Sequence, residues 1–132
     1  MYSLYFDGAS RGNPGPASLG GVIYDSEKEE KINYKKAIGV ATNNYAEYQA
    51  LLAGIKICIK YGIKEVAVYG DSKLVIEQVK GNWKVKNETL KPMYLEIKKC
   101  ITPEFFKKIT FSHVRRHLNK RADELANMAL DN

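Results

Sequence analysis

The chain has 132 residues, of which 45% are hydrophobic, and its formal net charge is +6 at pH 7. This length predicts one domain over residues 1–132 with a real core, and the two cysteines, Cys58 and Cys100, exclude a disulfide framework and a zinc site. Both fit packed thiols, and a bridge between them stays open. The basic excess is compatible with a polyanionic partner or with a lysine-rich solvated surface.

The first forty residues predict three strands joined by short turns. Residues 2–6 form an apolar run that is typical of a strand. Residues 8–16 are rich in Gly, Pro, Ser and Asn, which predicts a tight loop. Residues 19–24 and 31–40 predict a second strand and a third, partly exposed one. We therefore expect an antiparallel meander at the N-terminus.

The rest of the chain alternates between helical and strand patterns. In order we expect these elements: helix 45–61, strand 64–69, helix 72–80, helix 88–101, strand 105–114, and a helix from 119 or 120 to 130. The order βββαβααβα favours an α/β fold, because strand–helix–strand units pair in parallel with right-handed crossovers. We expect a mixed five-stranded sheet with helices on both faces.

Four carboxylates occupy positions that suit a shared site. Asp7 and Asp71 each follow an apolar strand-like run, while Glu47 and Asp123 lie near the starts of helical stretches. Acids that converge on one sheet edge repel each other unless a cation neutralises them, and oxygen-only ligands suit Mg²⁺ or Mn²⁺. Taken singly, each acid also fits a helix cap or a solvated surface group.

Four motifs in register resemble those of ribonuclease H, type 1, in its compact archaeal and bacterial branch. They are residues 7–16 (Asp-Gly-Ala-Ser-Arg-Gly-Asn-Pro-Gly-Pro), residues 42–47 (Thr-Asn-Asn-Tyr-Ala-Glu), residues 70–75 (Gly-Asp-Ser-Lys-Leu-Val), and His113 to Arg116 with Asn119 and residues 122–126 (Ala-Asp-Glu-Leu-Ala). The resemblance covers essentially the whole chain and implies a ribonuclease H-like fold. It implies a metal-dependent endoribonuclease that cuts the RNA strand of RNA/DNA hybrids and leaves 5′-phosphate and 3′-hydroxyl ends.

The resemblance also assigns roles to the acids. It implies that Asp7, Glu47, Asp71 and Asp123 are catalytic and hold two Mg²⁺ ions, with Mn²⁺ as a substitute, in a two-metal-ion mechanism. His113 matches a mobile histidine that assists proton transfer or product release. Its structural alternative is a strand-end histidine without a role, and the division of labour with the neighbouring arginines stays open.

Several polar positions match residues that contact nucleic acid in the family, and others have the chemistry to do so. They are Asn13, Thr42, Asn43, Asn44, Lys73, Trp83, Arg115 and Arg116. Turn and cap chemistry is the alternative for Asn13, Thr42, Asn43 and Asn44. Trp83 also fits a core side chain beneath the segment that connects the two helices. We expect no basic handle of the kind that larger bacterial members carry between these helices, and no hybrid-binding domain before Asp7.

The partner that the resemblance implies is an RNA/DNA hybrid, and double-stranded RNA stays open as a second substrate. A catalytically silent nucleic-acid-binding module on the same fold is the alternative, although clustered acids facing phosphates argue against it. An integrase-type strand transferase fits the spacing less well. No apolar run approaches the roughly 20 residues that span a bilayer and no signal peptide is indicated. We therefore expect a soluble, cytoplasmic monomer with no membrane partner.

Overall fold

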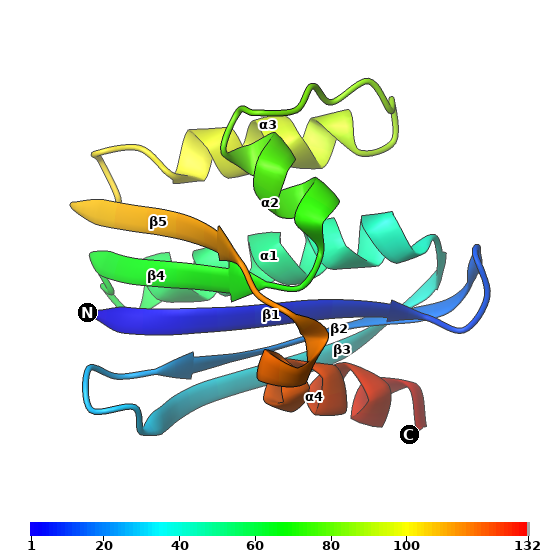
Figure 1. The fold of residues 1–132 in the computed structure, drawn as a ribbon, viewed down its shortest axis with the longest axis horizontal. Helices are drawn as coiled ribbons and strands as arrows, with labels where there is room; N and C mark the ends of the chain where they lie inside the picture. Colours follow the sequence, from blue (N-terminus) through cyan, green and yellow to red (C-terminus); the bar gives the residue numbers. More distant parts are fainter. Residues whose placement is uncertain (132) are drawn as a thin grey trace.

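The computed structural model describes residues 1–131 and contains the elements in the expected order. The strands are β1 (Tyr2–Ser10), β2 (Gly15–Tyr24), β3 (Glu30–Ala41), β4 (Glu65–Gly70) and β5 (Lys108–His113). The helices are α1 (Asn43–Lys60), α2 (Lys73–Val79), α3 (Lys91–Cys100) and α4 (Lys120–Asp131), and a 3₁₀ turn, η1 (Arg116–Leu118), precedes α4. Figure 1 shows the strands side by side in one sheet.

The sheet is mixed and five-stranded, in the order β3-β2-β1-β4-β5. The first three strands pair antiparallel, as a meander must, whereas β4 pairs in parallel with both β1 and β5. The parallel pairs are reached through α1 and through α2 and α3, because a parallel connection needs a crossover. The expected mixed sheet is thereby confirmed.

Helices cover both faces of the sheet. The long helix α1 packs on β1 and β2, and α3 packs on α1, while α4 packs on β2, β1 and β3 from the other side. In Figure 1, α4 lies in front of β2 and β3 and α1 lies behind the sheet. The face under α1 holds the main core, with large side chains such as Leu4, Phe6 and Leu51 fully buried.

Glycine makes the contact of α4 with the sheet unusually close. A Cβ atom at Gly20 would lie 2.5 Å from the backbone nitrogen of Ala126, so only glycine fits beneath this helix. Next to it on the same face, the hydroxyl of Ser18 donates a hydrogen bond to the carbonyl oxygen of Ala126. These contacts hold α4 against β2.

The first loop is shorter than expected. β1 continues to Ser10 and β2 begins at Gly15, so the predicted loop over residues 8–16 was too long. Gly and Pro suggested a loop, but strand pairing prevails because Ser10 pairs with Ala17. The backbone N–H of Arg11 also donates to the carbonyl oxygen of Pro16.

Other boundaries moved less. The last strand, predicted for residues 105–114, is shorter because the N–H groups of Phe105 and Phe106 donate to the carbonyl oxygen of Thr102.

Cys58 and Cys100 are both free thiols, so they do not form the disulfide that the sequence left open. Among residues 1–131, none of the helices is both long and apolar enough for a transmembrane segment.

Candidate metal centre and nucleic-acid interface

Two neighbouring strands deliver Asp7 and Asp71 to the same edge of the sheet. β1 and β4 run in parallel, with Phe6 opposite Gly70, so the residue that follows each of these lies next to the other. Asp7 is only 4% exposed, and the side chain of Asp71 is 11% exposed. The two carboxylates therefore lie close together in a largely dry site.

Glu47 reaches this edge from α1. Its side-chain Oε1 accepts a short hydrogen bond from the backbone N–H of Gly8, and it is 3% exposed. A Cβ atom at Gly8 would overlap the backbone of Ala46 and Glu47, so glycine is needed for α1 to approach β1 here. The residue after Asp7 thus positions the second carboxylate.

Asp123 approaches from the opposite face, on the first turn of α4. Asn119, just before this helix, donates its side-chain Nδ2 to the carbonyl oxygen of Phe6 at 2.9 Å. The backbone N–H of Asp123 in turn donates to the carbonyl oxygen of Asn119. The Nδ2 of Asn127 donates to Asp123 Oδ1 at 3.2 Å. Asn119 therefore links the strand that carries Asp7 to the helix that carries Asp123.

The carboxylates suit a hard cation. Oxygen atoms of Asp7, Glu47 and Asp71 all lie within 4.8 Å of one another, and all the donors are carboxylates. Mg²⁺ and Mn²⁺ prefer such oxygen ligands, whereas zinc is usually held by nitrogen and sulfur. Asp123 lies outside this group of three. After burial and the charges of Glu47 and Asp71, its charge also helps to raise the pKa of Asp7, so a fourth carboxylate borders the same site.

Without a cation, burial favours the protonated forms of Asp7 and Glu47. Burial raises the pKa of Asp7 to about 10, and the charges of Glu47 and Asp71 add to the effect. Burial also raises the pKa of Glu47 to about 8, helped by the charge of Asp71 and opposed by the Gly8 hydrogen bond. Buried carboxylates that crowd one another cannot all ionise alone. A bound dication would remove this cost.

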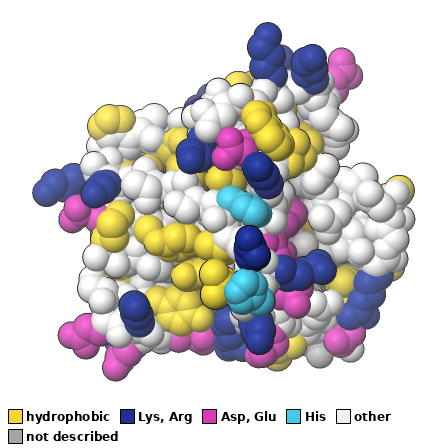
Figure 2. Space-filling view, viewed as in Figure 1, with side chains coloured by type: hydrophobic (Ala, Val, Ile, Leu, Met, Phe, Trp, Pro, Cys, Tyr) yellow, Lys and Arg dark blue, Asp and Glu magenta, His cyan; other side chains and the backbone are white. Residues whose placement is uncertain are grey.

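Basic side chains border the acids along the segment after β5. Arg116 brings its Nε to 3.9 Å from Asp71 Oδ2, and the ring Nε2 of His113 lies 3.3 Å from the Asp71 carbonyl oxygen. Arg115 is exposed, and no ion pair joins it to the acids among the described residues. Figure 2 shows histidine and basic side chains in a row beside acidic ones on this face.

The loop residues predicted to touch nucleic acid form one exposed rim. Asn13 accepts a hydrogen bond at 3.1 Å from the backbone N–H of Asn43, which joins the β1–β2 loop to the start of α1. Thr42 caps α1, because its hydroxyl accepts from the N–H of Tyr45, while Asn44 is exposed. Structural hydrogen bonds therefore account for the Thr42 hydroxyl and for the Oδ1 of Asn13. The exposed side chain of Asn44 can still meet a ligand.

Lys73 and Trp83 lie outside the acidic group but on the surface. Lys73 is the exposed first residue of α2. It follows Asp71 and Ser72, and Ser72 caps this helix. Trp83 is 44% exposed in the connector after α2, so the alternative that it fills the core is wrong. Asn119 was not predicted as a site residue, but its hydrogen bond to Phe6 makes it one. A polar residue just before a helix is the sequence signal for such a positioning role.

Comparison with known proteins agrees with this geometry. Residues 5–129 match the protein family described as Reverse transcriptase-like. Ribonuclease HI of Halobacterium salinarum is 41% identical over 127 residues, which are 96% of this chain and 63% of that protein. The crystal structure of RNase H1 from this archaeon matches with a TM-score of 0.94 and 39% identity, covering 98% of this chain and 97% of that one. The chain belongs to the ribonuclease H family.

Two further members of related sequence extend the comparison. The crystal structure of LC11-RNase H1 in complex with an RNA/DNA hybrid has a TM-score of 0.93 and 38% identity, covering 99% of this chain and 97% of that one. A bifunctional protein of Mycobacterium tuberculosis is 45% identical over 126 residues, which are 95% of this chain and 34% of that protein. The chain thus spans about a third of that relative and under two thirds of the Halobacterium protein.

Proposed function

We propose that residues 1–132 form the catalytic domain of an endoribonuclease that hydrolyses the RNA strand of RNA/DNA hybrids. The observation that carries this proposal is the meeting of Asp7, Glu47 and Asp71 within 4.8 Å, in a chain of the ribonuclease H family. The hybrid bound by LC11-RNase H1 supports the choice of substrate. Double-stranded RNA is a second substrate to test.

Two Mg²⁺ ions, with Mn²⁺ as a substitute, are the cofactors that fit this donor set. Asp7 would contact both ions, Glu47 and Asp71 would complete one site, and Asp123 would help to hold the other. When bound, such ions supply Lewis acidity to the attacking water and to the leaving oxygen. Hydrolysis of this kind leaves a 5′-phosphate and a 3′-hydroxyl.

Arg116 and His113 are the groups of this chain that we propose to assist the chemistry. Arg116 carries a permanent charge 3.9 Å from Asp71, where it can hold a phosphate that approaches the acids. The His113 ring is exposed and within reach of the Asp71 carbonyl, so it can exchange a proton with solvent and with the product. We propose Arg116 as the phosphate ligand and His113 as the proton carrier.

The exposed rim of Asn13, Thr42, Asn43 and Asn44 is proposed to meet the backbone and 2′-hydroxyls of the hybrid. Amide side chains both donate and accept, which suits ribose hydroxyls, and A-form duplexes are recognised through a wide minor groove. Outside the rim, three further groups are proposed to contact the duplex: Lys73 and Arg115 by charge, and Trp83 by stacking on a sugar or base. The monomeric state and the cytoplasmic location remain predictions.

The test is cleavage of end-labelled RNA/DNA hybrid, double-stranded RNA and double-stranded DNA, each with Mg²⁺, Mn²⁺ or EDTA. Metal-dependent cutting of the hybrid's RNA strand is expected, with none in EDTA. Hybrid that is bound but never cut would favour the catalytically silent module instead.

A matched pair of variants assigns the activity to the site. Glu47→Gln keeps the oxygen that accepts from Gly8 but removes the charge, so folding should survive while cleavage falls at least a hundredfold. Glu88→Gln makes the same change at an exposed position away from the site and should cut normally. Equal activity in the two variants would refute the site.

A further inference from the structure

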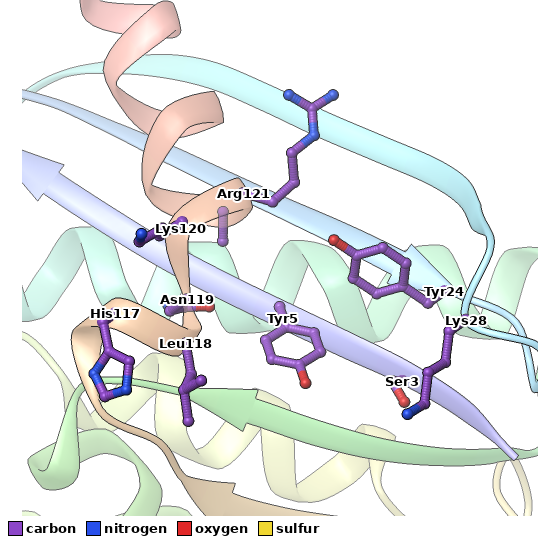
Figure 3. Close-up of a pocket in the computed structure, with 10 residues that line it drawn as sticks. Ser3, Tyr5, Tyr24, Lys28, His117, Leu118, Asn119, Lys120 and Arg121 are labelled. Carbon is purple, nitrogen blue, oxygen red and sulfur yellow. The ribbon is translucent and has the colours of Figure 1, made fainter.

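A pocket separate from the metal centre opens on the α4 face of the sheet, beside the start of that helix. The pocket has a volume of about 500 Å³, within the range of small-molecule sites. Figure 3 shows that its wall is built from β1, from the β2–β3 hairpin and from the η1–α4 segment, with Tyr5 between Leu118 and Tyr24. None of the carboxylates of the metal centre lines it.

The tyrosines of this pocket lie next to the metal centre. Side chains two apart on a strand share a face about 7 Å apart, so Tyr5 lies on the face that carries Asp7. Its partner in the neighbouring strand is Tyr69, which in turn precedes Asp71 by two residues. The rings of Tyr5 and Tyr69 stack with centroids 4.9 Å apart, and Tyr24 meets Tyr5 edge-on at 5.7 Å. These three tyrosines form one continuous aromatic surface.

This surface is not closed by the fold. All three tyrosines are only partly buried, and Leu118, at the mouth of the pocket, is 59% exposed. Figure 2 shows hydrophobic side chains gathered in a patch on this face next to a histidine. Helix α4 begins only at Lys120, and its close contact with the sheet lies farther along β2, where Ala122 and Ala126 pack on Gly20.

The charged side chains that line the pocket are all basic, although Glu27 and Glu29 flank Lys28 in the hairpin turn. The lining includes Lys28, His117, Lys120 and Arg121, and no acid. Arg121 is paired with Glu30 and Glu124, whereas neither lysine forms an ion pair among residues 1–131. Lys28 also has a φ of 65°, so the hairpin turn that presents it adopts a conformation that L-residues rarely take. Two unpaired ammonium groups thus flank the tyrosines.

Aromatic side chains with cations at their margin suit one class of ligand. Nucleobases stack on such rings whatever their sequence, while lysines neutralise the connecting phosphates. Open sheets that expose aromatic rings bind single-stranded RNA in this way. We propose that this pocket binds an unpaired nucleotide of a single-stranded segment, with its base on the tyrosine surface and its phosphates at Lys28 and Lys120.

The position next to Asp7 and Asp71 suggests the source of that segment. The unpaired overhang of a hybrid held at the metal centre would reach the pocket across the η1 turn; this part of the inference rests on the proposed function. Binding of a free single strand does not rest on it. The two ideas can therefore fail separately.

The experiment measures binding of a fluorescein-labelled six-nucleotide oligothymidylate by anisotropy, at low salt and in EDTA, where cleavage is absent. Tyr24→Leu and Lys120→Gln should each raise the Kd about fivefold or more, because each removes one stacking or phosphate contact. The matched controls are Tyr61→Leu, at a tyrosine 61% exposed elsewhere, and Lys99→Gln, on the exposed side of α3. Both controls should leave the Kd within twofold.

A second measurement does not depend on any variant folding. Uridine monophosphate added to ¹⁵N-labelled wild-type protein should shift the backbone amides of Tyr24, Tyr69 and His117. Shifts confined to the metal centre, equal losses in variants and controls, or no binding would overturn the proposal. So would uptake of a proline-rich peptide, the other ligand that aromatic grooves take, in place of the oligonucleotide. Wild-type cleavage of a blunt hybrid, which has no overhang, tests the proposed function separately.

Discussion

Asn119 and Phe6 are joined by a hydrogen bond of 2.9 Å, from the side-chain amide of one to the backbone carbonyl of the other, across 113 positions of the chain. Asn119 is 1% exposed, and its Oδ1 is a buried atom without a hydrogen-bond partner among the described residues. A buried polar group in this state costs free energy unless a donor satisfies it. The bond is therefore kept at some cost, and it ties Asp123 to the strand of Asp7.

Replacing Asn119 by Ala should lower stability and activity together. The carbonyl oxygen of Phe6 would lose its side-chain donor in a dry environment, at about 1–3 kcal/mol in the free energy of unfolding. Asp123 would lose its link to β1, so the apparent metal affinity should also fall. Urea denaturation and a Mg²⁺ titration of activity check both. Asn127→Ala is the control, since it removes a contact of Asp123 but none of β1. Equal effects of the two variants would contradict a role for the link to β1.

Replacing Asp7 by Asn should abolish cleavage and stabilise the metal-free protein at pH 8. Burial and neighbouring acids raise the pKa of Asp7 to about 10 in the folded protein. The folded state therefore holds a proton that the unfolded state loses near pH 4, and metal-free stability falls as pH rises from there through the folded pKa. The Asn side chain of the variant does not titrate, so the variant does not lose this stability as the pH rises. Its melting temperature should exceed that of wild type by several degrees or more, since each kcal/mol is worth about 4 °C in a domain of this size.

The pH and the metal supply the controls for that comparison. At pH 4, close to the unfolded pKa, the two proteins should melt nearly together. Mg²⁺ should raise the melting temperature of wild type at pH 8 because it binds only the folded state, and should do so less in Asp7→Asn. A variant that melts below wild type at pH 8 in EDTA would show that the charge of Asp7 is not costly.

Replacing Gly8 by Ala should damage the site through packing alone. The added Cβ overlaps the backbone of Ala46 and Glu47, so α1 must move away from β1. Overpacking of this kind costs about 1–3 kcal/mol, and a displaced Glu47 should reduce cleavage at least tenfold. Gly62→Ala is matched: Gly62 has a φ of 69° but open space around it, so the change should cost stability only. Thermal melting and hybrid cleavage separate the two, and full activity in Gly8→Ala would be the contrary result.

Replacing Arg116 and replacing its neighbour Arg115 should change different kinetic constants. Arg116→Ala removes the charge 3.9 Å from Asp71 and should lower kcat about tenfold or more. Arg115→Ala removes only a surface charge and should raise KM while leaving kcat nearly intact. Steady-state cleavage of one hybrid at several salt concentrations checks this split, because only the Arg115 effect should fade at high salt. A KM effect alone for Arg116 would move it to the binding surface.

The acidic edge was predictable because it follows from local rules. A strand-like run before Asp7 and another before Asp71 imply parallel neighbours whose ends meet, and a helix between them brings Glu47 across. The length of the first hairpin was not predictable in the same way. Gly and Pro at residues 12–16 look like loop, and only pairing with a partner strand reveals that β1 runs on to Ser10.

Surface features were less accessible from the sequence. Whether Trp83 is buried depends on what packs above its connector, and burial there is decided by distant residues. The tyrosine surface has a period-two signal, since Tyr5 and Tyr69 precede Asp7 and Asp71 by two. That signal shows which face they share, but only the starting point of α4 decides that they stay uncovered.

Asp7 belongs to the central strand of the sheet, paired opposite Gly20 and next to the end of β4, whereas Arg116 lies on a three-residue turn. Segments held by many buried backbone bonds open only when the whole domain unfolds, while short turns open locally at little cost. Amide hydrogen exchange should therefore be slowest on the β1 side of the site and fast around η1. One wall of the site is as stable as the fold itself, and the other can open locally to admit the proposed duplex substrate and release its fragments.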